Sequence, residues 1–549
     1  MSDASIICSH LSFAWPDSTR VFQDLSFAVG AGRTGLVAPN GAGKSTLLRL
    51  IAGEYRPASG TVSVQGVLGY LPQNLPLTGD QSVAEVLGVS AVIEALNAVE
   101  SGDPAEEHFT VIGDDWDIED RTAAQLDRLG LGGLALTRRL DTLSGGQAVS
   151  LGLAAQLLKR PDVLLLDEPT NNLDLQARRQ LHGVLENWTG CLLVVSHDRA
   201  LLDLMDQIAE LDGSEVHFHG GNFTAYTQAL AAAREVAEKN VRNAEQTVKR
   251  EKREMQQARE RAARRASNAA RNIGNAGLPK IVAGAMKRNA QETAGKSNET
   301  HAARVAVAKA RLDAADRALR DEQKIALELP GTKVPAGRTL FDGEELQVRY
   351  GQRAVFAEGG VTLTIRGPER IALTGANGAG KSTLLKILNG AVEPEGGVIR
   401  RAEGRVAYLS QRLDLLDAER TVAENLAAFA PVMPEAQRMN LLARFLFRGS
   451  RIHLPVGLLS GGERLRATLA CVLFAEPAPQ LLLLDEPTNN LDLVSVGQLE
   501  NALNAYEGAF VVVSHDERFL AEIKVERWLG LHDGRLGECG PATSGAGSR

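Results

Sequence analysis

One set of sequence motifs occurs twice in this chain, and the duplication constrains the fold more than any other feature. The set consists of a glycine-rich loop, a Leu-Ser-Gly-Gly segment, an apolar run that ends in Asp-Glu, and an apolar run that ends in Ser-His-Asp. The first copy lies at residues 38–46, 143–147, 166–170 and 196–198, and the second at 375–383, 459–463, 484–488 and 514–516. Lys44 precedes Gln73 by 29 residues, Lys381 precedes Gln411 by 30, and the interval from Asp to His is 30 in both copies. A lone glycine-rich loop can arise by chance, whereas two sets at matched spacing indicate a duplicated domain.

The hydrophobic pattern around the motifs predicts the α/β class. In each copy an apolar strand leads into the glycine-rich loop, and a helix is expected to begin near Lys44 or Lys381. The apolar runs before Asp167 and Asp485, and before the two Ser-His-Asp motifs, are typical of buried parallel strands. With 549 residues the chain is long enough for several domains. We therefore expect two tandem doubly wound P-loop domains.

The glycine-rich loops have the composition of a nucleoside-triphosphate site. A glycine loop that opens a helix presents backbone N–H groups to phosphate oxygens. Lys44 and Lys381 are predicted to reach the terminal phosphates, and Ser45 and Ser382 to ligate Mg²⁺. The further nucleotide contacts predicted from the loops are Asn40, Gly41, Gly43 and Thr46 in the first copy and Gly375, Asn377, Gly378, Gly380 and Thr383 in the second. Ala38 stands where the second loop has Gly375, and it could tighten the turn.

The carboxylates at the strand ends predict a metal-assisted hydrolysis. Asp167 and Asp485 would lie beside the Mg²⁺, together with Gln73 and Gln411. Glu168 and Glu486 follow directly and are positioned to polarise the attacking water. His197 and His515 fit a role in orienting the γ-phosphate.

The charge is distributed unevenly along the chain. The formal net charge is −8, yet residues 231–330 contain 22 Lys and Arg against 13 Asp and Glu, a net of +9 that leaves −17 for the rest. This segment is rich in alanine, and its sequence predicts two antiparallel helices of about 46 residues, each about 70 Å long, joined at Asn272–Pro279. Seven basic residues and no acidic one occur between Arg261 and Ala290. They are the candidate RNA contacts Arg261, Arg264, Arg265, Arg271, Lys280, Lys287 and Arg288. The alternative is a solvated helical pair that only spaces the domains.

Three further features bound the interpretation. The first copy has 22 extra residues between Gln73 and its Leu-Ser-Gly-Gly segment, and we expect them as an acidic, helix-poor surface loop near Ser101–Asp120. The four cysteines are too scattered for a disulfide framework or a metal cluster and are expected to be buried. The longest apolar runs have the length of strands, and the N-terminus does not have the pattern of a secretion signal. A cytoplasmic protein is expected.

These motifs resemble those of the ATP-binding cassette superfamily, whose signature is the Leu-Ser-Gly-Gly-Gln at residues 143–147. The resemblance covers both copies and implies that two cassettes stack head to tail, so that each ATP meets the signature of the other cassette. It assigns Lys44, Gln73, Glu168 and His197 to a first site with Ser460, Gly461, Gly462 and Glu463. It assigns Lys381, Gln411, Glu486 and His515 to a second site with Ser144, Gly145, Gly146 and Gln147. It also places Trp15 and Tyr350 where an aromatic ring stacks on adenine, although a packing role is as plausible for each.

Two cassettes joined by a basic helical hairpin further resemble the ABC-F subfamily. The domains are expected at residues 1–226, 227–330 and 331–536, with a flexible tail at 537–549. The resemblance implies an ATPase that binds the ribosome near the tRNA exit site in its ATP-bound state, with the hairpin reaching toward the peptidyl-transferase centre and contacting rRNA and tRNA. Hydrolysis would release it. Two roles remain open, protection against antibiotics and work as a translation factor. The alternatives from other classes are the ATPase subunit of a membrane exporter and a DNA-binding cassette protein. A monomer is the simplest expectation, because one chain holds both halves of the sandwich.

Overall fold

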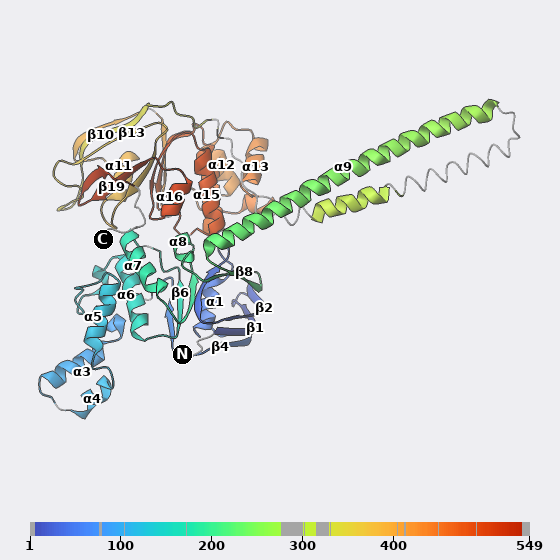
Figure 1. Ribbon diagram of the computed structural model, residues 1–549. Helices are drawn as coiled ribbons and strands as arrows, with labels where there is room; N and C mark the ends of the chain where they lie inside the picture. Colours follow the sequence, from blue (N-terminus) through green and yellow to red (C-terminus); the bar gives the residue numbers. More distant parts are fainter. Residues whose placement is uncertain are drawn as a thin grey trace. The chain divides into compact units, whose positions relative to one another are not determined.

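The computed structural model describes residues 6–75, 80–103, 105–171, 173–275, 300, 302–314, 329, 331–402, 404–410, 413–447, 449–489 and 491–540. The chain forms two compact units (Figure 1). One unit contains Met1–Thr224 and Ile325–Arg549, and the other contains Ala225–Lys324. We call residues 6–220 the first cassette and residues 331–540 the second cassette. Both belong to the first unit and contain one copy of the motifs each.

The first cassette combines two sheets. Its six-stranded sheet has the order β5-β6-β7-β3-β8-β9, parallel except for the last strand. Its antiparallel sheet has the order β2-β1-β4. The strands are β1 (Ile6–Ala14), β2 (Arg20–Val29), β3 (Gly32–Val37), β4 (Ser59–Val64), β5 (Leu68–Leu71), β6 (Val163–Asp167), β7 (Cys191–Val195), β8 (Gln207–Asp212) and β9 (Glu215–Gly220). Every residue of β6 and β7 is buried, as predicted for central parallel strands.

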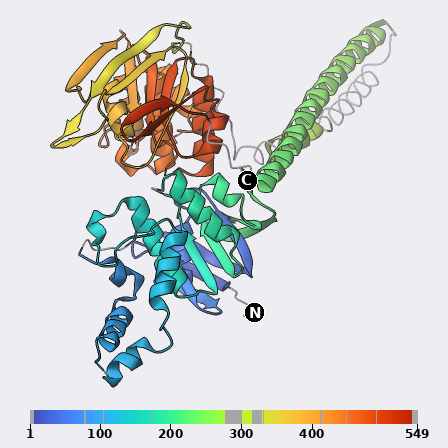
Figure 2. The same ribbon diagram turned by 60° about the vertical axis from the view of Figure 1, so that its left-hand side comes forward.

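The second cassette repeats this arrangement. Its six-stranded sheet has the order β16-β17-β18-β14-β19-β20, and its antiparallel sheet has the order β13-β10-β15. In Figure 2 the yellow and orange antiparallel strands lie beside the strands of the larger sheet. The strands are β10 (Thr339–Gln347), β13 (Val361–Arg366), β14 (Arg370–Thr374), β15 (Gly396–Arg401), β16 (Arg405–Leu409), β17 (Pro479–Asp485), β18 (Ala509–Val513), β19 (Arg527–His532) and β20 (Arg535–Glu538), with a small hairpin of β11 (Arg349–Tyr350) and β12 (Arg353–Ala354). β20 ends two residues inside the tail expected from position 537 onward.

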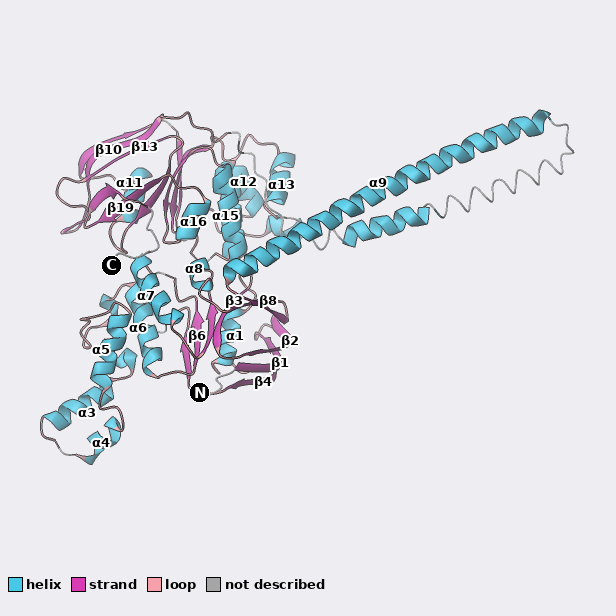
Figure 3. Cartoon of the chain, viewed as in Figure 1, coloured by secondary structure: helices cyan, strands magenta, loops and turns pink. Residues whose placement is uncertain are grey.

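Helices occur at corresponding places in the two cassettes (Figure 3). In each, one helix follows the glycine-rich loop, one follows the Leu-Ser-Gly-Gly segment, and two follow the carboxylate and histidine strands. The helices of the first cassette are α1 (Lys44–Ile51), α2 (Val83–Leu87), α5 (Ile118–Arg128), α6 (Gly145–Leu158), α7 (Leu175–Glu186) and α8 (Arg199–Leu202). Those of the second are α11 (Lys381–Leu388), α12 (Val422–Phe429), α13 (Glu435–Arg444), α14 (Gly461–Leu473), α15 (Leu493–Ala505) and α16 (Glu517–Glu522).

The prediction of a helix-poor loop near Ser101–Asp120 was wrong. That stretch contains α4 (Glu106–Ile112) and the start of α5, and it follows α3 (Ser90–Glu100). Since α2 and α5 correspond in position to α12 and α13, the extra residues of the first cassette are the pair α3 and α4, which pack on each other. The acidic residues that suggested a loop lie in the first turns of α4 and α5, where negative charge stabilises a helix.

The described part of the second unit is helical. α9 (Phe223–Asn275) has 53 residues, about 80 Å at 1.5 Å per residue, and continues past the end expected at Arg271. Residues 302–314 form a second helical stretch that runs beside α9 in the opposite direction (Figures 1 and 2). Val241 and Val248 on α9, and Val305 and Ala308 on the second stretch, are buried. Most of the expected joint at Asn272–Pro279 and the start of the return helix lie outside the described residues.

Cysteine burial was predicted correctly for three positions and wrongly for one. Cys8, Cys191 and Cys471 are buried, whereas Cys539, just after β20, is exposed. Across the described ranges, no helix is both long enough and apolar enough to cross a membrane. The same part of the chain holds no group of three His, Cys, Asp or Glu that could bind a metal ion.

Candidate nucleotide-binding sites

The two glycine-rich loops have the same geometry around their lysines. α1 and α11 begin at Lys44 and Lys381, after Gly43 and Gly380 in the left-handed region (φ 93° and 104°). A Cβ at Gly43 would meet the side chain of Phe22 at 2.8 Å, so the turn requires glycine. Neither helix start has a side-chain cap, which leaves its N–H groups available to an anion.

Both lysines are buried and bond to the carbonyls of their own loops. Lys44 Nζ donates to Ala38 O (2.8 Å) and Pro39 O (3.2 Å), and Lys381 Nζ donates to Gly375 O (2.7 Å) and Ala376 O (3.0 Å). Their exposed fractions are 8% and 7%. Burial lowers the pKa of both lysines, and nearby carboxylates oppose that shift. A buried ammonium at a helix start is suited to the terminal phosphates of a nucleotide.

The residues predicted for Mg²⁺ meet in the first cassette. Asp167 is 1% exposed at the end of β6, and neither carboxylate oxygen has a hydrogen bond of good geometry. Burial raises the pKa of Asp167, while Ser45, Arg49, Lys44 and Gln73 act to lower it. A buried carboxylate beside a hydroxyl is an oxygen set that fits Mg²⁺, and the contact of Gln73 with Asp167 is made by its backbone N–H. In the second cassette Asp485 is also buried and accepts a bond from the Tyr408 hydroxyl (3.0 Å), and Ser382 lies at the start of α11. Gln411 lies outside the described residues.

The Glu and His residues form the same pair in both cassettes. His197 Nε2 is 3.3 Å from Glu168 Oε1, and His515 Nε2 is 3.3 Å from Glu486 Oε1. Both glutamates have a positive φ (50° and 48°), which is costly for a residue with a side chain and is typical of functional positions. Burial raises the pKa of Glu168 to about 8 and that of Glu486 to about 7, and it lowers the pKa of each histidine to about 3. Each pair therefore couples a neutral imidazole with a carboxyl group that can exchange a proton near neutral pH.

The signature segments cap helices. Ser144 precedes α6 and forms a capping box with Gln147, and Ser460 precedes α14 and forms the same box with Glu463. Gln147 Oε1 accepts from the Ser144 N–H at 3.0 Å, and Glu463 Oε2 accepts from the Ser460 N–H at 3.1 Å. Because Gln and Glu satisfy the same bond, the capping geometry explains why the second signature tolerates Glu463. Arg451 also pairs with Glu463.

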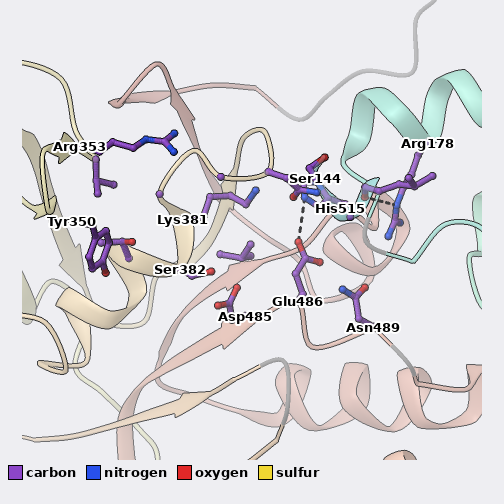
Figure 4. Close-up of a pocket in the computed structure, with 18 of the residues that line it drawn as sticks. Ser144, Arg178, Tyr350, Arg353, Lys381, Ser382, Asp485, Glu486, Asn489 and His515 are labelled. Atoms are coloured by element: carbon purple, nitrogen blue, oxygen red, sulfur yellow. Dashed lines mark hydrogen bonds and ion pairs between the residues drawn. The ribbon is translucent and has the colours of Figure 1, made fainter. Parts of the chain in front are cut away.

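A cavity of about 650 Å³ lies at the second site and is lined by both cassettes (Figure 4). The second cassette contributes Lys381, Ser382, Glu486 and His515 among others, and the first contributes Ser144. The full lining also includes Gly145, Leu173, Arg178, Tyr350, Arg353, Ala354, Val355, Asn377, Gly378, Gly380, Thr383, Asp485, Asn489 and Val513. The lining brings Ser144 and Gly145 of the first signature together with the second glycine-rich loop, and their contact with a nucleotide there stays a prediction. Gly146 is buried beside them in α6.

Two aspartates missed in the sequence analysis act across the cassettes. The Asn40 N–H of the first loop donates to Asp492 Oδ2 of the second cassette at 3.0 Å. The charges of Asp492 and Asp174 act on the lysine of the opposite cassette, Lys44 and Lys381 respectively. The signal that could have found them is a repeated Leu-Asp-Leu, seven residues after each metal-site aspartate. Ser460, Gly461 and Gly462 lie at the start of α14, and their approach to the first site stays a prediction.

The two aromatic candidates have different surroundings. Trp15 is 37% exposed and packs edge-on against Phe13 and Tyr55, with ring centroids 5.2 and 5.6 Å away. Tyr350 is 54% exposed and lines the cavity of the second site. Tyr350 is thus free to stack on a base, whereas Trp15 already has aromatic neighbours.

The basic candidates on the helical unit are only partly described. Arg261, Arg264 and Arg265 are exposed on α9, and at this spacing they share one face of the helix. Arg271 lies in the last turns of the same helix. Lys280, Lys287 and Arg288 lie outside the described residues.

Comparison with known families matches each cassette separately. The family described as "ABC transporter" matches residues 22–171 and 359–489. These two ranges contain both glycine-rich loops and both carboxylate strands. The fold and the two matched nucleotide-binding cassettes define a twin-cassette ATPase.

Relatives extend the similarity over almost the whole chain. The tylosin resistance ATP-binding protein TlrC of Streptomyces fradiae is 35% identical and aligns over 94% of this chain and 94% of its own length. ABC transporter F family member 5 of Arabidopsis thaliana is 30% identical over 94% of this chain and 73% of its own. The energy-dependent translational throttle protein EttA of Mycobacterium tuberculosis is 30% identical over 90% and 86%. The chain belongs to the ABC-F subfamily of ATP-binding cassette proteins, and as such it binds and hydrolyses ATP.

Solved structures support the fold. The archaeal ribosome recycling factor crystallised with a ribosomal stalk protein superposes with a TM-score of 0.57 at 20% identity, covering 96% of this chain and 89% of that one. At this identity the likeness concerns the arrangement of the chain alone.

Proposed function

We propose that this ATPase acts on the ribosome, binding near the tRNA exit site when ATP closes its two cassettes and leaving after hydrolysis. The observation that carries the proposal is the likeness over 94% of both chains to a protein named for tylosin resistance, together with the likeness to a translational throttle protein. The chemical product of the reaction is ADP and phosphate, and its useful result would be a change of conformation. We place the protein in the cytoplasm, where ribosomes are found.

The basic helical unit supports RNA as the partner. Upstream on α9, arginines have acidic partners on their own helix, such as Arg234 with Glu238 at 3.2 Å and Arg250 with Glu254 at 3.9 Å. From Arg261 to Asn275 the helix has no acidic residue. Exposed arginines such as Arg261, Arg264 and Arg265 suit phosphate contact and base stacking. The seven candidates from Arg261 to Arg288, including those outside the described residues, would contact rRNA and tRNA near the peptidyl-transferase centre.

The start of α9 lies where the nucleotide state can act on it. Asp203, just after α8, accepts the Thr224 N–H at 2.7 Å and pairs with Arg518 of α16 at 3.1 Å. The Arg518 guanidinium lies 5.7 Å from the centre of the Phe223 ring. α8 and α16 follow the two histidine loops directly. Movement of these loops on hydrolysis would therefore reach the first turn of the long helix.

The proposed chemistry uses the same roles in both cassettes. Glu168 and Glu486 accept the proton of the attacking water, and His197 and His515 orient the γ-phosphate. Asp167 and Asp485, with Ser45, Ser382, Gln73 and Gln411, would hold Mg²⁺. When bound, Mg²⁺ would neutralise charge that develops on the phosphates. The lysines and the helix starts hold the phosphates in place.

Ribosome co-sedimentation tests the proposal. The chain with Glu168→Gln and Glu486→Gln should bind ATP without hydrolysing it and should therefore pellet with ribosomes when ATP is added. The matched control carries Glu85→Gln and Glu424→Gln, which alter exposed capping carboxylates at equivalent places in the two cassettes, and it should pellet much less. If the double variant binds ATP but stays in the supernatant, ribosome binding is wrong and the exporter subunit becomes the leading alternative.

Drug protection and translation-factor activity separate in a second experiment. The wild-type chain, expressed in a sensitive host, should reduce inhibition by macrolides, including tylosin, or by lincosamides or pleuromutilins. Protection that disappears in the Lys44→Ala, Lys381→Ala variant would assign the resistance role. Unchanged inhibition, with ribosome pelleting confirmed, would favour the translation-factor role indicated by the throttle relative.

A further inference from the structure

The helices that follow the two cross-acting aspartates differ at one position beside the ATP sites. Asp174 is followed by Leu-Gln-Ala-Arg, and Asp492 is followed by Leu-Val-Ser-Val. The fourth residue is thus Arg178 in the first cassette and Val496 in the second. Val496 is 3% exposed and belongs to the hydrophobic core of the second cassette. Arg178 instead lines the cavity of the second ATP site.

Arg178 is held in a fixed position. Its Nε donates to the backbone carbonyl of Leu173 at 3.3 Å, and its Nη1 donates to Asp198 Oδ2 at 3.4 Å. The side chains of Arg178 and Asp198 are only 12% and 8% exposed, so water screens this pair weakly. Asp198 is itself fixed, because its Oδ1 caps α8 through the N–H groups of Ala200 (2.9 Å) and Leu201 (3.2 Å).

The guanidinium faces the reacting groups of the other cassette. Figure 4 places Arg178 on the side of the cavity that also holds His515 and Glu486. Its charge acts on Glu486, as that of Lys381 does, and it also acts on His515. The cations that act on Glu168 in the first site include Lys44 but no counterpart from α15, because that position is Val496.

The same arginine also contacts the histidine loop of its own cassette. Asp198 follows His197, which pairs with Glu168 of the first site. Arg178 therefore contacts the histidine loop of the first site and also lines the cavity of the second site. At the corresponding position of α15, Val496 has no charge to offer Asp516.

We propose that Arg178 is a positioning residue of the second ATP site, supplied by the first cassette, and that it makes the second site the faster of the two. A fixed positive charge beside Glu486 and the phosphates keeps the carboxylate aligned with the attacking water and stabilises negative charge in the transition state. The proposal rests on the assignment of Lys381 and Glu486 to ATP given above. It does not depend on ribosome binding.

The test measures each site separately, in the full chain and without ribosomes. Glu168→Gln leaves the second site as the active one, and Glu486→Gln leaves the first. Arg178→Met, which keeps the length of the side chain and removes its charge, should lower kcat at least about 10-fold in the Glu168→Gln chain, with a smaller change in KM. The same substitution in the Glu486→Gln chain should lower kcat much less, because Arg178 reaches the first site only through Asp198. Single-turnover hydrolysis, with protein in excess over ATP, gives the same rate constant where steady-state turnover is slow.

Matched variants separate positioning from a structural effect. Arg179→Met removes the neighbouring, exposed arginine that pairs with Glu517 at 3.3 Å, and it should leave the second site unchanged. Arg178→Lys should restore part of the rate, because it restores the charge without the two-point contact. Equal losses at both sites, or the same loss with Arg179→Met, would overturn the proposal. A Glu168→Gln chain that does not hydrolyse ATP even with Arg178 intact would instead refute the site assignment.

Discussion

The two cassettes share their catalytic parts and differ in the parts around them. Lysine, carboxylate and histidine lie in the same geometry in both, and the Glu and His nitrogen and oxygen atoms are 3.3 Å apart in each. The differences are Ala38 against Gly375, Gln147 against Glu463, Arg178 against Val496, and the added pair α3 and α4. The residues expected to contact the phosphates are therefore the same in the two copies, whereas residues around them differ. These differences are therefore the candidates for the cause of unequal ATP binding or hydrolysis at the two sites.

The shared part is tested by the largest expected effect. Glu168→Gln with Glu486→Gln keeps the shape of both side chains but removes their ability to accept a proton. We expect ATP turnover, measured as phosphate release, to fall by a factor of about 100 or more, while ATP binding stays. The Glu85→Gln, Glu424→Gln chain is the control and should turn over normally. Substantial turnover by the first variant would mean that another group activates the water.

Substitution at the first position of the glycine-rich loop should give the next largest effect, a loss of ATP affinity. We expect this loss in the second cassette only. Gly375 has φ 147°, and a Cβ there would collide with the Leu531 carbonyl oxygen. Gly375→Ala should therefore weaken ATP binding at the second site by about 2 kcal/mol, about 30-fold in affinity. Ala38 already has a Cβ and packs partly against the core of the first cassette, so Ala38→Gly should change binding little.

Nucleotide titration of chains that carry one intact lysine resolves the two loops. Lys44→Ala isolates the second loop for Gly375→Ala, and Lys381→Ala isolates the first for Ala38→Gly. An equal loss from both loop substitutions would show that the loops have the same backbone requirement and would remove this difference between the cassettes.

The spacing of repeated motifs predicted most of the two sites. It located Lys44, Asp167, Glu168 and His197 and their counterparts, because strands ending at one edge of a parallel sheet bring such residues together. It also predicted the long helical segment from alanine content and the absence of breakers. These inferences depend on local sequence pattern. In the structure the residues lie at strand ends and at the helix start after each glycine-rich loop, as the pattern predicts.

Comparison of the repeats could not reveal residues that only one copy has. Arg178 was missed for this reason, and Asp174 and Asp492 were missed because their role depends on how the cassettes dock. α4 was missed because seven residues are too few for a clear helical period. Cys539 was expected to be buried from residue type alone, which does not identify the end of an edge strand.

The buried histidines predict the same pH dependence in both cassettes. Burial lowers the pKa of His515 from 6.5 to about 3, so between these values the unfolded chain binds a proton that the folded chain does not. Stability from this group is present above pH 6.5 and is lost as the pH falls. Between pH 6.5 and 5 the wild type should lose about 1.5 kcal/mol more than His515→Asn.

Urea unfolding of the ATP-free chain at the two pH values measures this difference. His197→Asn should have the same effect, because burial also lowers the pKa of His197 to about 3. His217→Asn, at an exposed histidine, is the control and should follow the wild type. If the two variants lose different amounts of unfolding free energy between the two pH values, the two histidines have different pKa values in the folded chain. The two sites would then differ at a position where their geometry is the same.

The smallest effect concerns the base-stacking candidates, and it separates the two sites again. Tyr350 is exposed in the cavity, so Tyr350→Ala should weaken ATP binding at the second site by about 1 kcal/mol, roughly fivefold. Tyr350→Phe keeps the ring and should bind normally.

Trp15 packs on Phe13 and Tyr55, so Trp15→Ala should lower the thermal midpoint of the chain more than Tyr350→Ala does. Because every purine offers a ring face, ATP and GTP should be affected alike by Tyr350→Ala. The opposite result, normal ATP binding by Tyr350→Ala and weakened binding by Trp15→Ala, would contradict this prediction. It would show that the base stacks on Trp15 at the first site and not on Tyr350 at the second.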